Sequence, residues 1–126
     1  MIRTELTLRL PNSPGALAEI CRLLSAEHVN IIALSLEATG RLHLVVDNPV
    51  RALGALAARH HQVSQLDVLF VAAGNNAGDL EPILSLVSSA GVNINYAYGS
   101  GMEASGTAAV VIGVDDAMRA SSVAGV

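Results

Sequence analysis

The sequence of 126 residues contains no lysine and no tryptophan, a single cysteine and few aromatic residues. One cysteine cannot form an intrachain disulfide or a cysteine-rich metal site. The seven arginines are outnumbered by eleven acidic residues, and aromatic side chains make up 2% of the chain. Nucleic-acid-binding proteins need a basic surface or a platform of stacking aromatics, so this composition argues against a nucleic-acid partner.

Charged residues are also scarce, at 14% of the chain, whereas hydrophobic residues reach 52%. Disordered segments combine low hydrophobicity with high net charge, so the sequence predicts a folded core. Gly, Asn and Ser interrupt the apolar stretches before they reach the roughly 20 residues that cross a bilayer. The alternating segment 1–10 differs from a secretory signal, and a lone thiol suits a reducing compartment. We therefore expect a cytoplasmic protein without a membrane segment.

The chain repeats itself with an offset of 63 residues. Between positions 12 and 31, nine of twenty residues recur, where chance gives about one or two. The first set is Asn12, Gly15, Leu17, Ile20, Leu23, Ser25, Val29, Asn30 and Ile31. The second set is Asn75, Gly78, Leu80, Ile83, Leu86, Ser88, Val92, Asn93 and Ile94. We therefore expect two similar domains, residues 1–65 and 66–126.

Hydrophobic spacing predicts an α+β fold in which each copy reads strand, helix, strand, strand, helix, strand. The expected elements of the first copy are a strand over 3–10, a helix over 13–28, strands over 29–37 and 42–46, a helix over 48–59 with Val50, Leu53, Leu56 and Ala57 inward, and a strand over 63–73. The expected elements of the second copy are that last strand again, a helix over 76–90, a strand over 92–98, a hairpin tip over 99–106, a strand over 107–114, and a short helix capped by Asp115 or Asp116.

The second copy lacks a clear fourth strand, so we expect a partner chain or the last residues to cover the edge of its first strand. In the strand over 29–37, simple alternation places Ile31 and Ala33 on one face and Ile32, Leu34 and Leu36 on the other. Both faces are apolar, so both should be covered. Helices cover one face, and a second sheet over the other face predicts a homodimer.

Residue patterns typical of enzymes are missing, so we expect a non-catalytic protein without a cofactor or a bound metal. Cys21 lies on the apolar stripe of the first helix, and no serine occupies a nucleophile elbow. Segment 99–106 lacks the lysine of a phosphate-binding loop. Four histidines are scattered away from metal-ligand spacing: His28, His43, His60 and His61.

An Asn-x-x-Gly turn precedes the first helix of each copy, at 12–15 and 75–78. A helix N-terminus offers free N–H groups to a carboxylate, glycine permits close approach, and asparagine both donates and accepts hydrogen bonds. Plain helix capping by Asn and Ser is the alternative. Asn30 and Asn93 begin the second strand of each copy, where asparagine is unfavourable. Either strand-start hydrogen bonding or ligand contact explains them.

Segments 11–20 (Pro-Asn-Ser-Pro-Gly-Ala-Leu-Ala-Glu-Ile) and 26–31 (Ala-Glu-His-Val-Asn-Ile) resemble the ACT domain, a small-molecule-binding module of regulatory proteins. The resemblance covers the chain as two tandem copies, the second degenerate because Ala77 replaces the proline. It implies two ferredoxin-like βαββαβ repeats with antiparallel sheets, the second truncated at its last strand. It also implies an amino-acid ligand at a domain–domain interface, as in stand-alone tandem ACT proteins.

The resemblance further implies which residues contact that ligand. The turn role falls on Asn12, Ser13, Gly15 and Ala16, with Leu17 beside them, and the strand role falls on Asn30 and Ile31. The matching positions of the second copy are Asn75, Asn76, Gly78, Asn93 and Asn95. Some members place a polar residue two positions before the turn asparagine, where this chain has Leu10 and Ala73.

The two turns differ in charge, because Asp79 stands in the second copy where the first has Ala16. An anionic ligand would meet a like charge at Asp79. We therefore expect a ligand carboxylate to prefer the turn over 13–16, paired with Asn93 or Asn95. Alternation places Tyr96 and Tyr98 on the core side of their strand.

These features favour a regulatory protein that binds an amino acid, with the response read by the dimer or by a metabolic enzyme partner. The alternative is a structural regulatory subunit that docks on a metabolic enzyme without binding a small molecule. A small enzyme of the acylphosphatase type is a third reading. It needs an arginine beside a catalytic asparagine in the loop, and neither turn contains an arginine.

Overall fold

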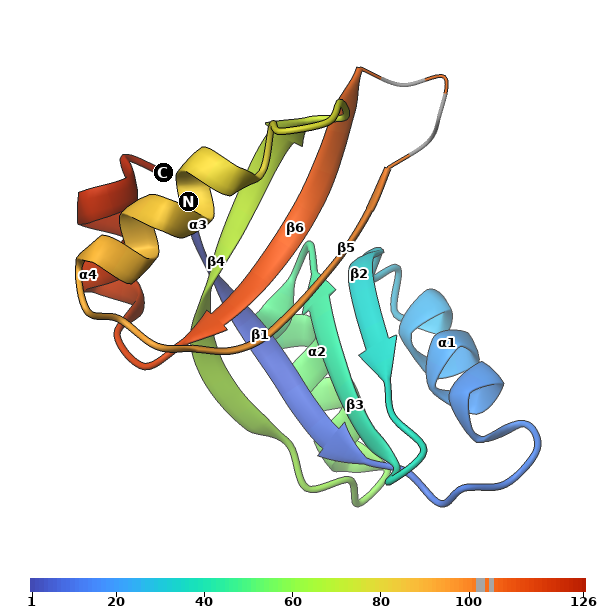
Figure 1. Ribbon diagram of the computed structural model, residues 1–126. Coiled ribbons are helices and arrows are strands. Elements are labelled where there is room, and N and C mark those ends of the chain that lie inside the picture. Colours follow the sequence, from blue (N-terminus) through green and yellow to red (C-terminus); the bar gives the residue numbers. More distant parts are fainter. Residues whose placement is uncertain (102–103, 105) are drawn as a thin grey trace. The chain divides into compact units, whose positions relative to one another are not determined.

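The computed structural model describes residues 1–101, 104 and 106–126. Across these residues the protein is an α+β fold of six strands, all paired antiparallel, and four helices (Figure 1). The chain divides into two compact units. We term residues 4–66 the N-terminal unit, and residues 1–3 together with 67–126 the C-terminal unit. Among the described residues, no helix combines the length and apolar character needed to span a membrane.

The N-terminal unit packs two helices on one face of its sheet, in which the strands are ordered β2-β3-β1. Its elements are β1 (Ile2–Arg9), α1 (Ala16–Ala26), β2 (Ile31–Leu36), β3 (Arg41–Val46), α2 (Pro49–Ala58) and the start of β4 (Ser64–Gly74). The expected alternation of Leu6, Leu8 and Leu10 is confirmed, since all three are buried in this core. Asn48 caps α2 as expected, its side-chain oxygen accepting from the Arg51 N–H at 3.1 Å.

The C-terminal unit has its own core, and the strands that follow β4 are ordered β4-β6-β5. Its further elements are α3 (Glu81–Ser89), β5 (Ile94–Gly101), β6 (Thr107–Val114) and α4 (Ala117–Ala124). Asp116 caps α4 by accepting from the Arg119 N–H at 3.0 Å, one of the two expected caps. The expected hairpin tip over 99–106 begins later, because β5 continues to Gly101, and residues 102, 103 and 105 lie outside the described residues.

The first residues of the chain complete the sheet of the C-terminal unit. The Phe70 N–H in β4 donates to the Met1 carbonyl at 2.8 Å, and Ile2 packs against the core of this unit. The Arg3 guanidinium lies 5.0 Å from the Phe70 ring centroid, a cation–π contact. Partial burial lowers the pKa of the Met1 amino group.

The expectation that a partner chain or the last residues would cover this edge of β4 is therefore wrong. β1 pairs with β3 only over residues 5–9, so its first residues remain free to pair elsewhere. The hydrophobic alternation of residues 3–10 did not indicate that β1 is divided between two units.

Two helices are shorter than the sequence predicted. α1 begins at Ala16 instead of Ser13, and α3 begins at Glu81 instead of Asn76. In α2 the prediction that Val50 and Ala57 point inward is wrong, since Val50 is 83% exposed and Ala57 is exposed as well. The buried stripe of α2 instead contains Ala52 and Leu56, one helical turn apart.

A register shift in β2, between Ile31 and Ala33, changes the faces that alternation predicted. Leu34 and Leu36 lie opposite Leu44 and Leu42 of the core, on the same face as Ile31, while Ala33 turns to the other face. The extra residue of a bulge reverses the alternation beyond it. Leu34 and Leu36 remain 40% and 43% exposed at the edge of the sheet.

The opposite face of the N-terminal unit's sheet contains a buried hydrogen bond between two polar side chains. Glu5 and His43 lie on neighbouring strands, with 3.0 Å between Glu5 Oε1 and His43 Nδ1. Both residues are almost fully buried. Buried polar side chains need hydrogen-bond partners, so this histidine has a structural explanation.

Both helices of the N-terminal unit end on a histidine in the left-handed region, His28 with φ 57° and His60 with φ 66°. The N–H groups of Val29 and His61 reach back to the carbonyls of Leu24 and Leu56, which closes each helix end. The corresponding helices of the C-terminal unit end with glycines in this conformation, Gly91 and Gly125. Glycine adopts it without the Cβ strain that histidine bears.

We expect His28→Gly to raise the free energy of unfolding by about 1 kcal/mol, because it relieves the Cβ strain of the left-handed conformation. Urea denaturation of the two proteins measures the difference. The matched reverse change, Gly91→Ala at φ 72°, should lower stability by a similar amount, although open space surrounds that position. Equal stability of all three proteins would contradict the assignment of strain.

Ile2→Ala should destabilise the C-terminal unit by about 1–2 kcal/mol, because this half-buried side chain packs on its core. Hydrogen exchange should show weaker protection of the Phe70 amide, which bonds to Met1. Val50→Ala, at a position 83% exposed, is the control and should change neither quantity. Unaltered exchange at Phe70 in the Ile2 variant would argue against the role of the N-terminal residues.

Candidate functional site

Helix α1 starts without a side chain bonded to its first turn. Gly15 is the N-cap residue, in the left-handed region with φ 84°, and no side-chain cap hydrogen bond is present. The Ala16 N–H reaches the Ser13 carbonyl at 3.3 Å, whereas the described residues contain no acceptor for the N–H groups of Leu17 and Ala18. Capping by Asn12 or Ser13, the simple explanation of these residues, is therefore absent.

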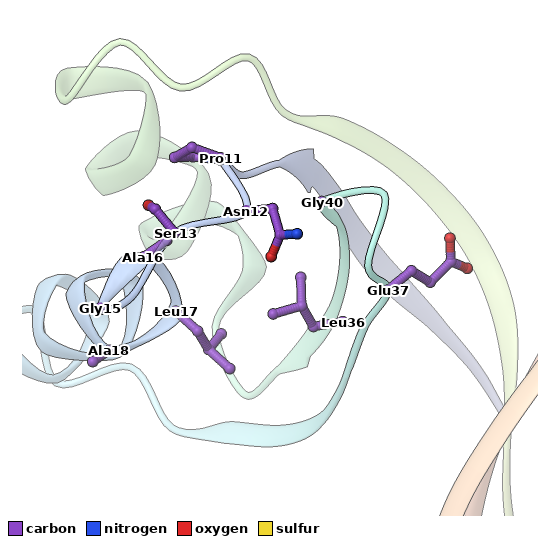
Figure 2. Close-up of a pocket in the computed structure, with 10 residues that line it drawn as sticks. All are labelled: Pro11, Asn12, Ser13, Gly15, Ala16, Leu17, Ala18, Leu36, Glu37 and Gly40. Atoms are coloured by element: carbon purple, nitrogen blue, oxygen red, sulfur yellow. The ribbon is translucent and has the colours of Figure 1, made fainter.

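These open N–H groups border a cavity of about 170 Å³. It is lined by Pro11, Asn12, Ser13, Gly15, Ala16, Leu17, Ala18, Leu36, Glu37 and Gly40. Figure 2 shows the side chains of Asn12, Leu17 and Leu36 pointing into the space between the turn and the end of β2, while Glu37 points away. Five of the predicted residues, those of the first turn with Leu17, thus lie together in one cavity.

The far wall of this cavity comes from a second turn, residues 37–40, which the site prediction missed. Gly40 has φ 91°, and a Cβ atom there would collide with the Leu10 carbonyl. The Leu10 N–H donates to the Gly40 carbonyl at 2.7 Å. This contact fixes the start of the Asn12 turn against β3, and the sequence signal for it was the Thr39-Gly40 pair.

Asn30 and Ile31 do not line this cavity. The Asn30 N–H donates to the Asp47 carboxylate at 2.9 Å, and the Asp47 N–H returns a bond to the Asn30 carbonyl at 3.0 Å. Ile31 packs against the core. The main chain at Asn30 therefore closes the start of the strand, while its exposed side chain makes no hydrogen bond within the described part of the chain.

The corresponding turn of the C-terminal unit is filled by the chain's own carboxylate. Asp79 Oδ2 accepts from the Asn76 N–H at 3.0 Å, and the Asp79 N–H donates to the Asn76 carbonyl at 3.2 Å. A Cβ atom at Gly74 would collide with this carboxylate. Asp79 thus precedes α3 instead of standing in its first turn, as the sequence had suggested.

Asn93 and Asn95 belong to a chain of polar side chains in the C-terminal unit. Asn93 Nδ2 donates to Asn95 Oδ1 at 2.8 Å, and Asn95 Nδ2 donates to Asp115 Oδ1 at 2.9 Å. Tyr96 and Tyr98 stack with 6.4 Å between ring centroids, and both are half-buried. The expectation that they lie on the core side is wrong, because a register shift after Ile94 places them opposite Gly113 and Val111, on the other face of the sheet. The amide of Asn95 is therefore already engaged at both of its ends.

The first turn offers hydrogen-bond donors of the kind that an anion accepts. Main-chain N–H groups at a helix N-terminus bind carboxylates, and Asn12 adds a side chain that can donate and accept. Leu17 and Leu36 supply apolar surface beside these polar groups. Within the described residues, no group of three or more His, Cys, Asp or Glu side chains could hold a metal ion.

Residues 4–60 match the family model of the ACT domain. This segment lies within the N-terminal unit and contains the cavity. No curated protein matches the chain.

Several solved structures share the fold. A protein from Bacteroides thetaiotaomicron is 29% identical with a TM-score of 0.85, over 98% of this chain and 86% of that one. The regulatory subunit of aspartate kinase from Thermus flavus is 17% identical with a TM-score of 0.65, over 98% and 90%. The ligand-free regulatory subunit from Thermus thermophilus is also 17% identical, with a TM-score of 0.67, over 95% and 89%.

Substitution of Asn12 separates capping from ligand contact. Because Asn12 does not cap α1, Asn12→Ala should leave the free energy of unfolding within about 0.5 kcal/mol of the parent. Asn48→Ala, which removes the observed cap of α2, should cost about 1 kcal/mol. Chemical denaturation measures both, and a loss at Asn12 as large as that at Asn48 would restore the capping explanation.

Proposed function

We propose that this chain is a non-catalytic regulatory protein that binds an amino acid through the open turn before α1. The observation that carries the proposal is a helix N-terminus whose first N–H groups border a cavity and lack a side-chain cap. The ligand carboxylate accepts hydrogen bonds from these N–H groups, and the side-chain amide of Asn12 forms hydrogen bonds with the polar groups of the ligand. The ACT match over residues 4–60 supports this assignment.

One turn per chain binds the ligand in this proposal. Both turns have a left-handed glycine, Gly15 and Gly78. In the second turn Asp79 already provides a carboxylate to the Asn76 N–H, so a ligand anion would meet both an occupied donor and a like charge. Ala16 at the equivalent place leaves the first turn neutral and open.

The ligand site lies at an interface between ACT-like domains, with a homodimer as the assembled form. Leu34 and Leu36 support this, since they are 40% and 43% exposed on the edge strand β2 beside the cavity. A domain that covers this edge would bury both leucines. In this proposal the chain is a cytoplasmic protein of two tandem ACT-like repeats, residues 1–65 and 66–126. Of the two asparagines expected to complete the site, Asn93 is favoured, because its amide oxygen accepts no hydrogen bond within the described residues, whereas both ends of the Asn95 amide are engaged.

Binding of the amino acid changes the packing of the dimer itself or the activity of a metabolic enzyme partner. A ligand shifts only an equilibrium between states that it binds differently, and a site at an interface meets this condition. The exposed edge of β2 also suits the alternative, a structural subunit that docks on an enzyme without a small ligand. The regulatory subunits of aspartate kinase with this fold make such a partner reasonable.

A thermal melt with an external dye against the twenty amino acids tests the proposal. A ligand at a hundred times its dissociation constant should stabilise the protein by about 2.7 kcal/mol, which is several degrees for a chain of this size. We expect one or a few amino acids to give such a shift. A flat panel from a dimer verified by sedimentation would favour the docking subunit.

Variants then locate the site for whichever amino acid binds. Asn12→Ala should weaken binding by about tenfold, the value of one good hydrogen bond. Gln62→Ala, an exposed amide outside the cavity, is the matched control and should bind as the parent does. Asn93→Ala tests the proposed contact from the second repeat. A ligand carboxylate bound beside Asp79 in a crystal structure would overturn the choice of turn.

A further inference from the structure

A second cavity of the N-terminal unit lies along α1 on the side away from β2. It has a volume of about 570 Å³ and is lined by Pro11, Glu19, Ile20, Arg22, Leu23, Ala26, Arg59 and His61. One wall is therefore a face of α1, and the other is the C-terminal end of α2 with the residues that follow it. We term this cavity the arginine groove.

The arginine groove is cationic in a protein whose net charge is −4. Arg22 and Arg59 are exposed, and neither forms an ion pair or side-chain hydrogen bond among the described residues. His61 is half-buried and lines the same cavity. Glu19 is the single acidic residue in the lining, so two permanent positive charges face one negative charge.

The donors of the groove differ in kind from those of the open turn. Guanidinium groups donate two parallel hydrogen bonds to phosphate or carboxylate oxygens, and they keep their charge at any physiological pH. A phosphate monoester carries about −1.5 to −2 charges and three acceptor oxygens, so it can satisfy two arginines at once. A single carboxylate has one charge and two oxygens.

The groove also has an apolar floor. Ile20 is buried beneath it, while Leu23, Ala26 and Pro11 add hydrocarbon surface beside the arginines. Small-molecule sites combine such apolar lining with a few fixed polar groups, in cavities of about 300–1,000 Å³. The volume and the lining suit a small organic body that carries a phosphate.

We propose that the arginine groove binds a small phosphorylated metabolite, whose phosphate lies between Arg22 and Arg59 and whose carbon skeleton lies on Leu23 and Ala26. This site shares only Pro11 with the cavity of the open turn, and its donors are side chains instead of main-chain N–H groups. His61 contributes a third donor to the phosphate. Glu19 opposes anion binding and limits the affinity of the groove.

Titration with phenyl phosphate, followed by amide chemical shifts, tests the groove directly. We expect shifts confined to the segment 19–26 and to residues 59–61. Inorganic phosphate should shift the same amides at higher concentration, and benzoate should bind at least tenfold more weakly than phenyl phosphate. Shifts scattered over the surface, or equal affinity for benzoate, would overturn the phosphate assignment.

Four variants make the test specific. Arg22→Gln and Arg59→Gln should each weaken phenyl phosphate at least tenfold, whereas Arg119→Gln, an exposed arginine on α4, should not. Glu19→Gln should strengthen binding several-fold, because it removes the opposing charge. A gain of affinity cannot come from misfolding, so unchanged or weaker binding in Glu19→Gln would overturn the proposal. Unaltered amino-acid binding in these variants keeps the two sites distinct.

Discussion

The left-handed glycine before α1 is the constraint from which the candidate site follows. Gly15 turns the chain so that the helix starts only at Ala16, and neither Asn12 nor Ser13 caps it through a side chain. The N–H groups of Leu17 and Ala18 therefore lack a side-chain cap, and both residues line the cavity. The Gly40 turn holds the other wall in place through its bond with Leu10. Two glycines in conformations that other residues adopt at a cost therefore create one concave, donor-rich surface.

The two units show how one residue difference, Ala16 against Asp79, gives two turns of similar sequence different structures. Each unit has the Asn-x-x-Gly sequence and a glycine with nearly the same φ. Asp79 folds back onto Asn76 and delays its helix to Glu81, whereas Ala16 has no side chain with which to do so. A carboxylate supplied by the chain costs no association entropy, so it outcompetes a weakly bound ligand for the same donors.

Hydrophobic periodicity predicted the α+β class, the order of the elements and the caps of α2 and α4, because these depend on local spacing and on single side chains. It failed where a distant contact or an extra residue decides the geometry. The bulge in β2 reversed the faces of Leu34 and Leu36. The cavity wall at Gly40 is held by a hydrogen bond from Leu10, thirty positions away in the sequence. The start of α1 depends on the left-handed conformation of Gly15, which a glycine can adopt but does not have to adopt. The turn residues of the candidate site were predicted together, but Asn30 serves its strand through main-chain atoms that any residue has.

The sharing of β1 between two units makes the chain's linear order differ from its structural order. Residues 1–3 pack with a unit whose remaining residues begin only at Asp67. A fragment cut between residues 66 and 67 therefore separates the C-terminal unit from the first residues of β1. Transfer of this unit to another protein requires residues 1–3 to move together with residues 67–126.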